Sequence, residues 1–209
     1  MGTKTLSQPR RIGVFGGTFD PIHNAHIEIA RAALTAGDLD VVLFMVAARP
    51  PHKTGETYAT PMQRLAMVRA AVANEPEMEA SAIELDREGP SYTFETLGVL
   101  HAEYPEAELF LILGYDSLVD LSGWREPDKI LERARLLVVA RPGRKQDVPE
   151  ELNGQYEIVP FDETDLSSTE IRSRIAQGVS ADDAIPRPVL DVIHKEGLYD
   201  VGVTDRARG

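Results

Sequence analysis

Short apolar runs alternate along the chain with stretches whose apolar residues recur every three or four positions. The runs are rich in Leu or β-branched residues and contain few polar positions, which is typical of strands covered on both faces of a sheet. Strands are predicted at residues 11–15, 41–46, 109–113, 136–140 and 156–161, with a weaker one at 80–85.

The stretches between these runs, and the last part of the chain, have the periodicity of amphipathic helices. Residues 60–63 (Thr-Pro-Met-Gln) and 167–170 (Ser-Ser-Thr-Glu) are capping boxes, which mark helix starts. Gly178 and Gly197 are typical helix ends. Helices are predicted at residues 26–34, from 60 onward, at 93–104, at 167–178 and at 188–196. This alternation favours an α/β fold, a Rossmann-like doubly wound parallel sheet with a small C-terminal helical segment.

Length and composition are those of an ordinary globular protein. The chain has 209 residues, of which 43% are hydrophobic and 27% charged. A chain of this length and composition can bury a hydrophobic core without disulfides or a structural metal. We expect a single domain over residues 10–200 with a C-terminal helical part at about 166–198. We expect residues 1–9 and 203–209 to be flexible termini, and residues 143–155 to form a polar surface loop.

The charge balance and the absence of cysteine exclude several classes of function. The net charge is −12, with 22 Lys and Arg against 34 Asp and Glu, and no basic run exceeds two residues. Nucleic acid and anionic membranes are therefore not expected as partners. Without Cys there is no disulfide, thiolate nucleophile or Cys-ligated zinc. No secretory signal or 18-residue apolar stretch is present, so a cytoplasmic location is expected.

The most informative segment is residues 16–26, GGTFDPIHNAH, directly after the first predicted strand. Gly16 and Gly17 permit close approach of a ligand to the backbone. His23 and His26 lie three residues apart at the start of a helix, where both can face a phosphate. Taken alone, Gly-Gly can be an ordinary turn, and two histidines can be a surface pair or half of a metal site. The segment is neither a Walker A motif nor GxGxxG.

This segment resembles the GxFDxxHxGH signature of the HxGH nucleotidyltransferases, with Ala25 where the pattern has Gly. Later segments narrow the resemblance to bacterial nicotinate-nucleotide adenylyltransferases, and together they cover nearly the whole chain. They are PPHK at residues 50–53, GPSYTFET at 89–96, GYDS at 114–117, Trp124 and SSTEIR at 167–172.

The resemblance implies adenylyl transfer from ATP to nicotinate mononucleotide, giving deamido-NAD and pyrophosphate. It implies charge stabilisation by His23, His26, Lys53 and Arg172. The implied ATP-binding residues are Gly16, Gly17, Thr18, Phe19, His23, His26, Gly114, Asp116, Ser167, Ser168 and Arg172. The implied residues for the nicotinate nucleotide are Asp20, Lys53, Tyr92, Thr93, Trp124 and Arg125. Mg²⁺ is expected to bind as a complex with ATP, and no metal site formed by the protein's own side chains is expected.

Several of these residues also have an ordinary structural interpretation. Lys53 can be a solvated loop residue, Trp124 a core residue and Asp116 a helix N-cap, while residues 167–172 can be a capping box with a surface Arg.

Other functions stay open. One is the same chemistry with nicotinamide mononucleotide, phosphopantetheine or a cytidylyl-transfer substrate, and another is a non-catalytic nucleotide sensor. Ala47, Tyr115 and Arg125 depart from the family pattern near the implied site. The oligomeric state, a homo-oligomer included, is also open.

Overall fold

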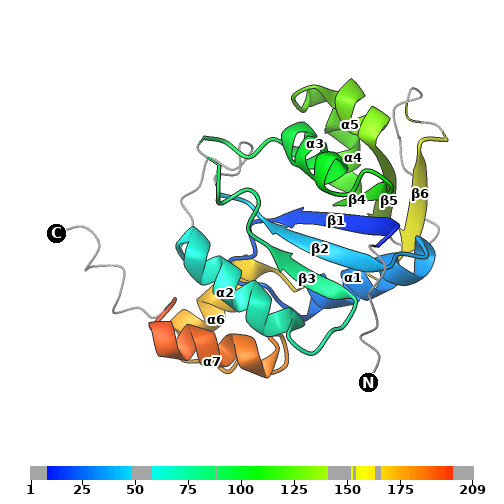
Figure 1. Cartoon of the computed structure of the whole chain (residues 1–209). Coiled ribbons are helices and arrows are strands. Elements are labelled where there is room, and N and C mark those ends of the chain that lie inside the picture. Colours follow the sequence, from blue (N-terminus) through cyan, green and yellow to red (C-terminus); the bar gives the residue numbers. More distant parts are fainter. Residues whose placement is uncertain are drawn as a thin grey trace, which may run out of the picture.

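The computed structural model describes residues 9–48, 58–87, 89–140, 152, 154–162 and 166–199. Its centre is a six-stranded parallel sheet with the order β3-β2-β1-β4-β5-β6 (Figure 1). This is the strand order of the doubly wound Rossmann fold, so the predicted fold class is confirmed. The strands are β1 (Arg11–Gly17), β2 (Val41–Val46), β3 (Met78–Ser81), β4 (Glu108–Gly114), β5 (Ala134–Ala140) and β6 (Tyr156–Pro160).

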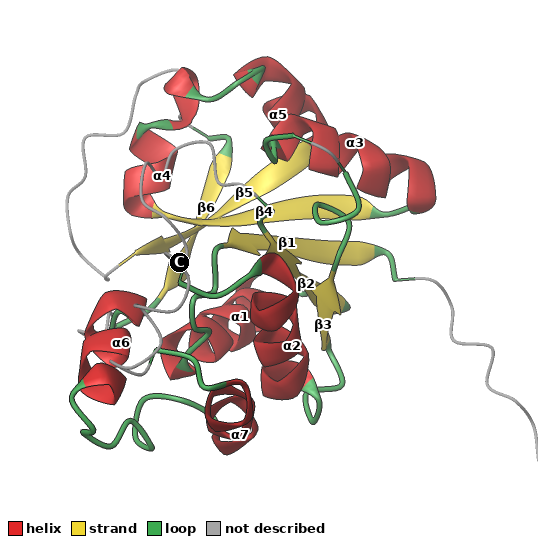
Figure 2. Cartoon of the chain, turned by 90° about the vertical axis from the view of Figure 1, so that its left-hand side faces the viewer, coloured by secondary structure: helices red, strands yellow, loops and turns green. Residues whose placement is uncertain are grey.

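Helices cover both faces of the sheet, as Figure 2 shows. One face carries α1 (Asn24–Ala36), α2 (Pro61–Val72) and the two C-terminal helices α6 (Ser168–Ala176) and α7 (Arg187–Glu196). The other face carries α3 (Thr93–Glu103), α4 (Tyr115–Val119), the 3₁₀ turn η1 (Leu121–Gly123) and α5 (Pro127–Arg133). The predicted C-terminal helical segment is therefore present, packed on the same face as α1 and α2.

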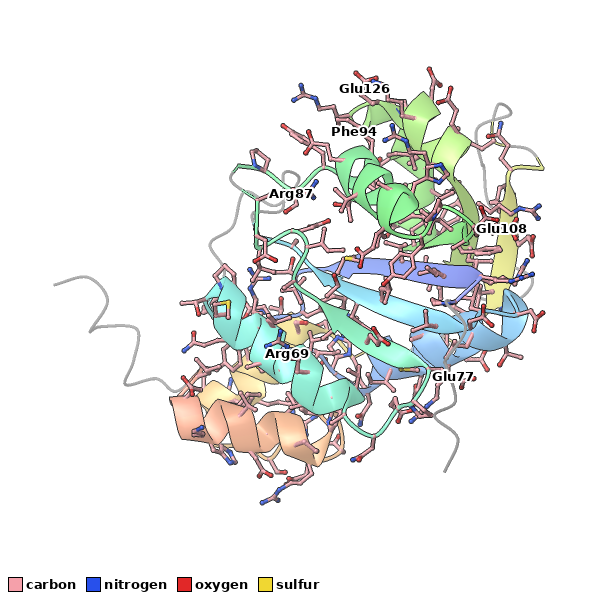
Figure 3. The ribbon with its side chains drawn as sticks, in the orientation of Figure 1. Arg69, Glu77, Arg87, Phe94, Glu108 and Glu126 are labelled. Carbon is pink, nitrogen blue, oxygen red and sulfur yellow. The ribbon has the colours of Figure 1, made fainter. Side chains whose placement is uncertain are left out.

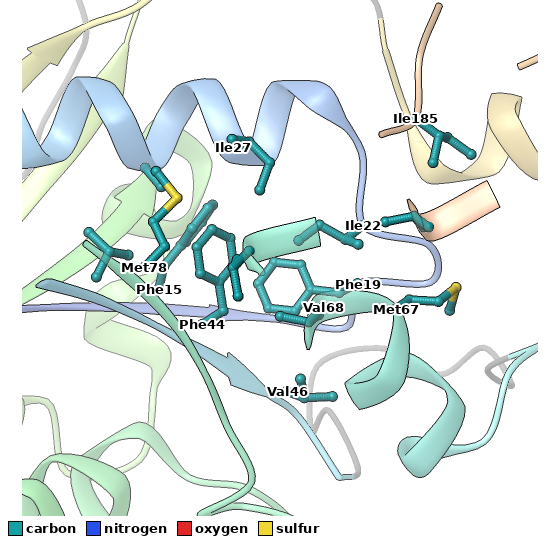
Figure 4. Packing of buried hydrophobic residues seen from close by; sticks show 14 of the residues in the cluster. Phe15, Phe19, Ile22, Ile27, Phe44, Val46, Met67, Val68, Met78 and Ile185 are labelled. Carbon is teal, nitrogen blue, oxygen red and sulfur yellow. The ribbon is translucent and has the colours of Figure 1, made fainter. Parts of the chain in front are cut away.

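The core consists of two apolar layers, one on each face of the sheet, and β2 shows why its sequence has no polar position. Val42 and Phe44 point into the layer under α1 and α2, while Leu43 and Met45 point into the layer under α3. All six residues of β2 are buried. In the first layer Phe15, Phe19 and Phe44 pack together beside α1 (Figure 4).

Two features of the fold differ from the sequence prediction. The third strand is Met78–Ser81 and not residues 80–85, because Ala82–Leu85 turns back on itself with Leu85 N–H donating to Ala82 O at 2.8 Å. The short helices α4 and α5, which separate β4 from β5, were not predicted. The predicted termini, Pro9 excepted, lie outside the described residues, as does most of the predicted loop at 143–155.

Candidate functional site

Successive strands are added toward one edge of the sheet from β1 to β3 and toward the other edge from β4 to β6. The switch point is therefore between β1 and β4, and doubly wound folds bind ligands at such a point. Both strands end in glycines. A side chain at Gly16 or Gly114 would meet no atom of the described residues within 4 Å, and both residues are exposed. Their backbone is therefore open to a ligand, as the sequence predicts for Gly16.

The second glycine of the pair serves packing. A Cβ at Gly17 would lie 2.6 Å from Cζ of Phe19, so only glycine allows the Phe19 ring to fold over this position. Phe19 is 2% exposed, has φ of 51°, and packs edge-on against Phe15 and His26. Its side chain belongs to the core (Figure 4), so a ligand contact by Phe19 can come only from its backbone.

His23 and His26 lie together at the start of α1, with ring centroids 3.8 Å apart. His23 is the N-cap residue, and its backbone N–H donates to Nδ1 of His26 at 3.2 Å. This bond places the proton of a neutral His26 ring on Nε2. His23 is 5% exposed, and its Nδ1 has no hydrogen-bond partner among the described residues. Burial lowers the pKa of His23 to about 4, so its ring is neutral at pH 7.

The C-terminal motif packs directly on the turn that follows β1. Ser167 is the N-cap of α6 and accepts from Glu170 N–H at 3.2 Å, as predicted. Ser168 Oγ donates to Pro21 O at 3.0 Å. Arg172 Nη1 donates to Asp20 O at 2.7 Å, and its Nη2 donates to Thr169 Oγ1 at 3.2 Å. Two motifs about 150 residues apart in the sequence thus form one cluster.

A second group of predicted residues lies around the start of α3. Tyr92 is the N-cap residue of this helix and Thr93 is its first residue. The Arg125 guanidinium lies 4.7 Å from the centroid of the Tyr92 ring. Trp124, next to Arg125, is half-buried against the apolar layer under α3. The structure therefore brings the predicted acceptor residues around α3 together, namely Tyr92, Thr93, Trp124 and Arg125.

One predicted residue of the described chain stands apart from these clusters. Asp116 is exposed in the first turn of α4, whose N-cap is Gly114. The N-cap interpretation of Asp116 is thus wrong, and Asp116 follows the N-cap Gly114 by two residues. Lys53 lies outside the described residues.

Asp20 points into the protein. It is 5% exposed, and its carboxylate accepts from Tyr58 N–H at 2.8 Å, Ala59 N–H at 3.3 Å and the Tyr199 hydroxyl at 2.6 Å. Burial, followed by the nearby Asp20 carboxylate, raises the pKa of Tyr199, so its hydroxyl stays protonated as a donor. The predicted contact of Asp20 with the acceptor stays a prediction.

Arg64 of α2 is fully buried beneath the same turn. Its Nη1 donates to Thr18 O at 2.7 Å. Burial lowers the pKa of Arg64, and the nearby Asp20 and Tyr199 raise it. The guanidinium thus fixes the backbone at Thr18 and compensates the buried charge of Asp20.

Comparison with known proteins agrees with this geometry. The Cytidylyltransferase-like family model matches residues 14–174. A Roseiflexus protein named a probable nicotinate-nucleotide adenylyltransferase is 45% identical over 194 residues, covering 90% of this chain and 97% of its own. The nicotinate-nucleotide adenylyltransferase of Bacillus subtilis is 38% identical over 191 residues, covering 91% and 99%. The chain belongs to the nicotinate-nucleotide adenylyltransferase family.

Solved structures match the fold. Nicotinic acid mononucleotide adenylyltransferase of Plasmodium falciparum complexed with APC has a TM-score of 0.72, with 19% identity, covering 91% of this chain and 97% of that one. The same enzyme complexed with NaAD has a TM-score of 0.71. At this identity the likeness concerns the fold.

A buried polar network beside Tyr92 and Thr93 was not predicted from the sequence. Thr96 Oγ1 donates to Glu84 Oε1 at 2.7 Å and accepts from Arg87 Nη2 at 2.7 Å. Thr96 is 1% exposed and Glu84 9%. Figure 3 shows Arg87 on the loop before α3 and Phe94 at the start of that helix. Ser91 Oγ also accepts from Ala48 N–H at 3.2 Å, which joins this loop to the end of β2. The network thus fixes the loop that carries Tyr92 and Thr93.

The buried His23 ring makes stability depend on pH. Its pKa is lowered from 6.5 to about 4 on folding, so the stabilisation is complete above pH 6.5 and is lost as pH falls toward 4. Between pH 7 and pH 5 this group alone should lower the free energy of unfolding by about 2 kcal/mol. Urea denaturation at both pH values should show a smaller loss in His23→Ala than in the wild type. Equal losses in the two proteins would contradict the buried neutral ring.

Proposed function

We propose that this chain transfers the adenylyl group of ATP to nicotinate mononucleotide, releasing deamido-NAD and pyrophosphate, a step of NAD biosynthesis. The observation that carries the proposal is the docking of the SSTEIR motif on the turn of the GGTFDPIHNAH motif, through Ser168 to Pro21 and Arg172 to Asp20. This cluster stands at the switch point of a sheet with the Rossmann order, beside the open backbone of Gly16.

The reaction needs positioning and charge neutralisation more than it needs a protein nucleophile. The acceptor's phosphate oxygen attacks the α-phosphorus in line, while the bond from this phosphorus to the β-phosphate oxygen breaks and pyrophosphate leaves. Negative charge grows on the non-bridging and leaving oxygens, where fixed N–H donors stabilise it. His23 and His26 would supply donors from the start of α1, and Arg172 would supply them from α6. Lys53 is proposed as a further cation.

The nucleotide's sugar and base would lie along the end of β4. The backbone at Gly114 is open, and Asp116, two residues further on, is exposed. A carboxylate accepts hydrogen bonds from ribose hydroxyls. Ser167, Thr18 and Phe19 would contribute through the turn after β1 and the start of α6.

The acceptor would lie on the side of α3. Amides in the first turn of a helix lack partners within the helix, so those following Tyr92 can bind the nicotinate carboxylate. The Arg125 guanidinium over Tyr92 adds positive charge at the same place, and Trp124 would stack on the pyridine ring. The carboxamide of nicotinamide carries no negative charge for these donors to bind.

Mg²⁺ would be held by the nucleotide rather than by the chain. In the described part of the protein, no group of three or more His, Asp or Glu side chains could hold a metal ion. Asp20 accepts two N–H groups and a hydroxyl with its oxygens. The ion prefers phosphate oxygens and water, and when bound it neutralises charge on the triphosphate. Its requirement stays a prediction.

The proposed reaction is tested by product analysis. With ATP, Mg²⁺ and nicotinate mononucleotide, the chain should form deamido-NAD and pyrophosphate in equal amounts, measured by chromatography and a coupled pyrophosphate assay. ATP consumption that yields ADP or AMP without the dinucleotide would contradict adenylyl transfer.

Trp124 gives a separate prediction for the acceptor side. Trp124→Ala should raise KM for nicotinate mononucleotide about 10- to 100-fold, because stacking of a base on an aromatic ring contributes about 1–3 kcal/mol. KM for ATP should stay within about twofold. Trp124→Phe keeps an aromatic ring and should retain most of the affinity. Steady-state kinetics with each substrate varied would measure this, and equal KM values in Trp124→Ala and wild type would contradict stacking.

Several expectations remain predictions. No helix among the described residues is long and apolar enough to cross a membrane. A cytoplasmic location, a single domain over residues 10–200 and the absence of a nucleic-acid partner rest on the sequence alone.

A further inference from the structure

Arg172, the proposed phosphate ligand on α6, is held from two sides by residues far away in the sequence. Its Nη1 donates to Asp20 O at 2.7 Å, and its Cζ lies 4.4 Å from the centroid of the Tyr58 ring. A guanidinium has five N–H donors. The bonds within the described residues, to Asp20 O and Thr169 Oγ1, leave donors for a phosphate.

Tyr58 itself needs support to act as a platform. The residue is 63% exposed, so the ring has little packing of its own. Its backbone N–H, however, donates to Asp20 Oδ2 at 2.8 Å, and the next N–H, of Ala59, donates to Oδ1 at 3.3 Å. The buried Asp20 carboxylate therefore fixes the backbone from which the Tyr58 ring reaches Arg172.

The Asp20 carboxylate is in turn fixed from the C-terminal end of the described chain. The Tyr199 hydroxyl donates to Asp20 Oδ1 at 2.6 Å, across 179 residues of sequence. The hydroxyl also lies 3.7 Å from Sδ of Met67 on α2. Hydrogen bonds to a charged acceptor are among the stronger ones, so losing this donor should loosen the carboxylate, which would keep only the N–H groups of Tyr58 and Ala59 as donors.

We infer that Tyr199, Asp20 and Tyr58 form a positioning chain that holds Arg172 ready for the triphosphate before any substrate binds. The inference rests on the proposed role of Arg172 toward ATP. It assigns to the segment after α7 a part in nucleotide binding, although Tyr199 touches no proposed substrate atom. The effect on ATP should exceed any effect on the acceptor residues Tyr92, Thr93, Trp124 and Arg125, which lie around α3 on the other face of the sheet.

The test measures binding of Mg·ATP by titration calorimetry without acceptor. Each substitution is made both in the wild-type chain and in the Arg172→Ala variant. Tyr199→Phe removes only the hydroxyl and should weaken Mg·ATP binding about tenfold. In an Arg172→Ala background the same change should weaken binding less than about twofold, because the residue it positions is gone. Tyr156→Phe, a hydroxyl removed from β6 at the edge of the sheet, is the matched control and should bind as the wild type does.

Tyr58 provides a second test that does not depend on a buried residue. Tyr58→Leu removes the ring and should reproduce the loss, while Tyr58→Phe keeps the ring and should restore wild-type affinity. The inference is overturned if both Tyr199→Phe and Tyr58→Leu bind Mg·ATP like the wild type, or if their losses are equally large with Arg172 absent. A wild-type chain that binds no Mg·ATP would instead overturn the proposed function, and this inference with it.

Discussion

His23→Ala should lower kcat about 100- to 1,000-fold, the usual cost of removing one fixed donor to a developing oxyanion. The imidazole is held at the N-cap of α1 with its ring 3.8 Å from that of His26, so solvent cannot replace it in the same position. Its Nδ1 is buried and has no hydrogen-bond partner among the described residues, so the assigned role requires the other ring nitrogen, Nε2, to face the phosphates. Steady-state kinetics with saturating ATP and nicotinate mononucleotide would measure the loss.

Stability should change far less than turnover. The alanine variant loses the packing of one ring but also removes an unpaired buried nitrogen, and these effects oppose one another. His101→Ala, an exposed histidine on α3, is the matched control and should keep wild-type turnover. A folded His23→Ala protein with turnover within threefold of the wild type would exclude the assigned role.

Arg172→Ala should be the second most damaging change, with kcat/KM for ATP reduced about 100-fold. A charged donor lost to an anion costs about 1.5–3 kcal/mol in a ground state and more where charge develops in the transition state. Arg172→Lys should recover only part of this, because an ammonium cannot donate to Asp20 O, Thr169 Oγ1 and a phosphate in the planar geometry of a guanidinium.

The matched control lies on the same helix. Arg174 is two residues further along α6 and pairs with Asp183, whereas Arg172 donates to Asp20 O. Arg174→Ala should therefore leave kcat/KM for ATP within about twofold of the wild type, as expected of a surface ion pair. If Arg172→Ala behaved like Arg174→Ala, α6 would have no role in binding the triphosphate.

The sequence predicted the sheet well because its strands are buried on both faces. Residues 41–46 have no polar position, and all six are buried in β2. The helix α5 was missed because its signals are weak. Glu126, its N-cap, makes no side-chain capping bond and has φ of 53°, and Ile130 is its one buried residue. The strand at 80–85 was displaced because Ile83 and Leu85 are apolar for packing in a turn rather than in the sheet.

Residues of the candidate site were predictable where they lie in continuous motifs. His23, His26, Ser168 and Arg172 stand in motifs that resemble those of a known family, and the structure brings the two motifs into contact through Ser168 and Arg172. The supports of the site were not predictable, because they come from distant parts of the chain. Nothing near Tyr199 points to Asp20, and nothing near Arg64 indicates that it binds Thr18 O at 2.7 Å. Such contacts depend on how α2 and the segment after α7 pack on the turn that follows β1.

The most direct measurement is pyrophosphate release with ATP and Mg²⁺, offering nicotinate mononucleotide, nicotinamide mononucleotide and phosphopantetheine in parallel. Donors around Tyr92, Thr93 and Arg125 should favour the charged nicotinate by at least about tenfold in kcat/KM, the value of one hydrogen bond to a charged group. Preference for another acceptor would contradict the carboxylate site while keeping adenylyl transfer. ATP binding with no pyrophosphate from any of the three acceptors would contradict the enzymatic function and favour a nucleotide sensor.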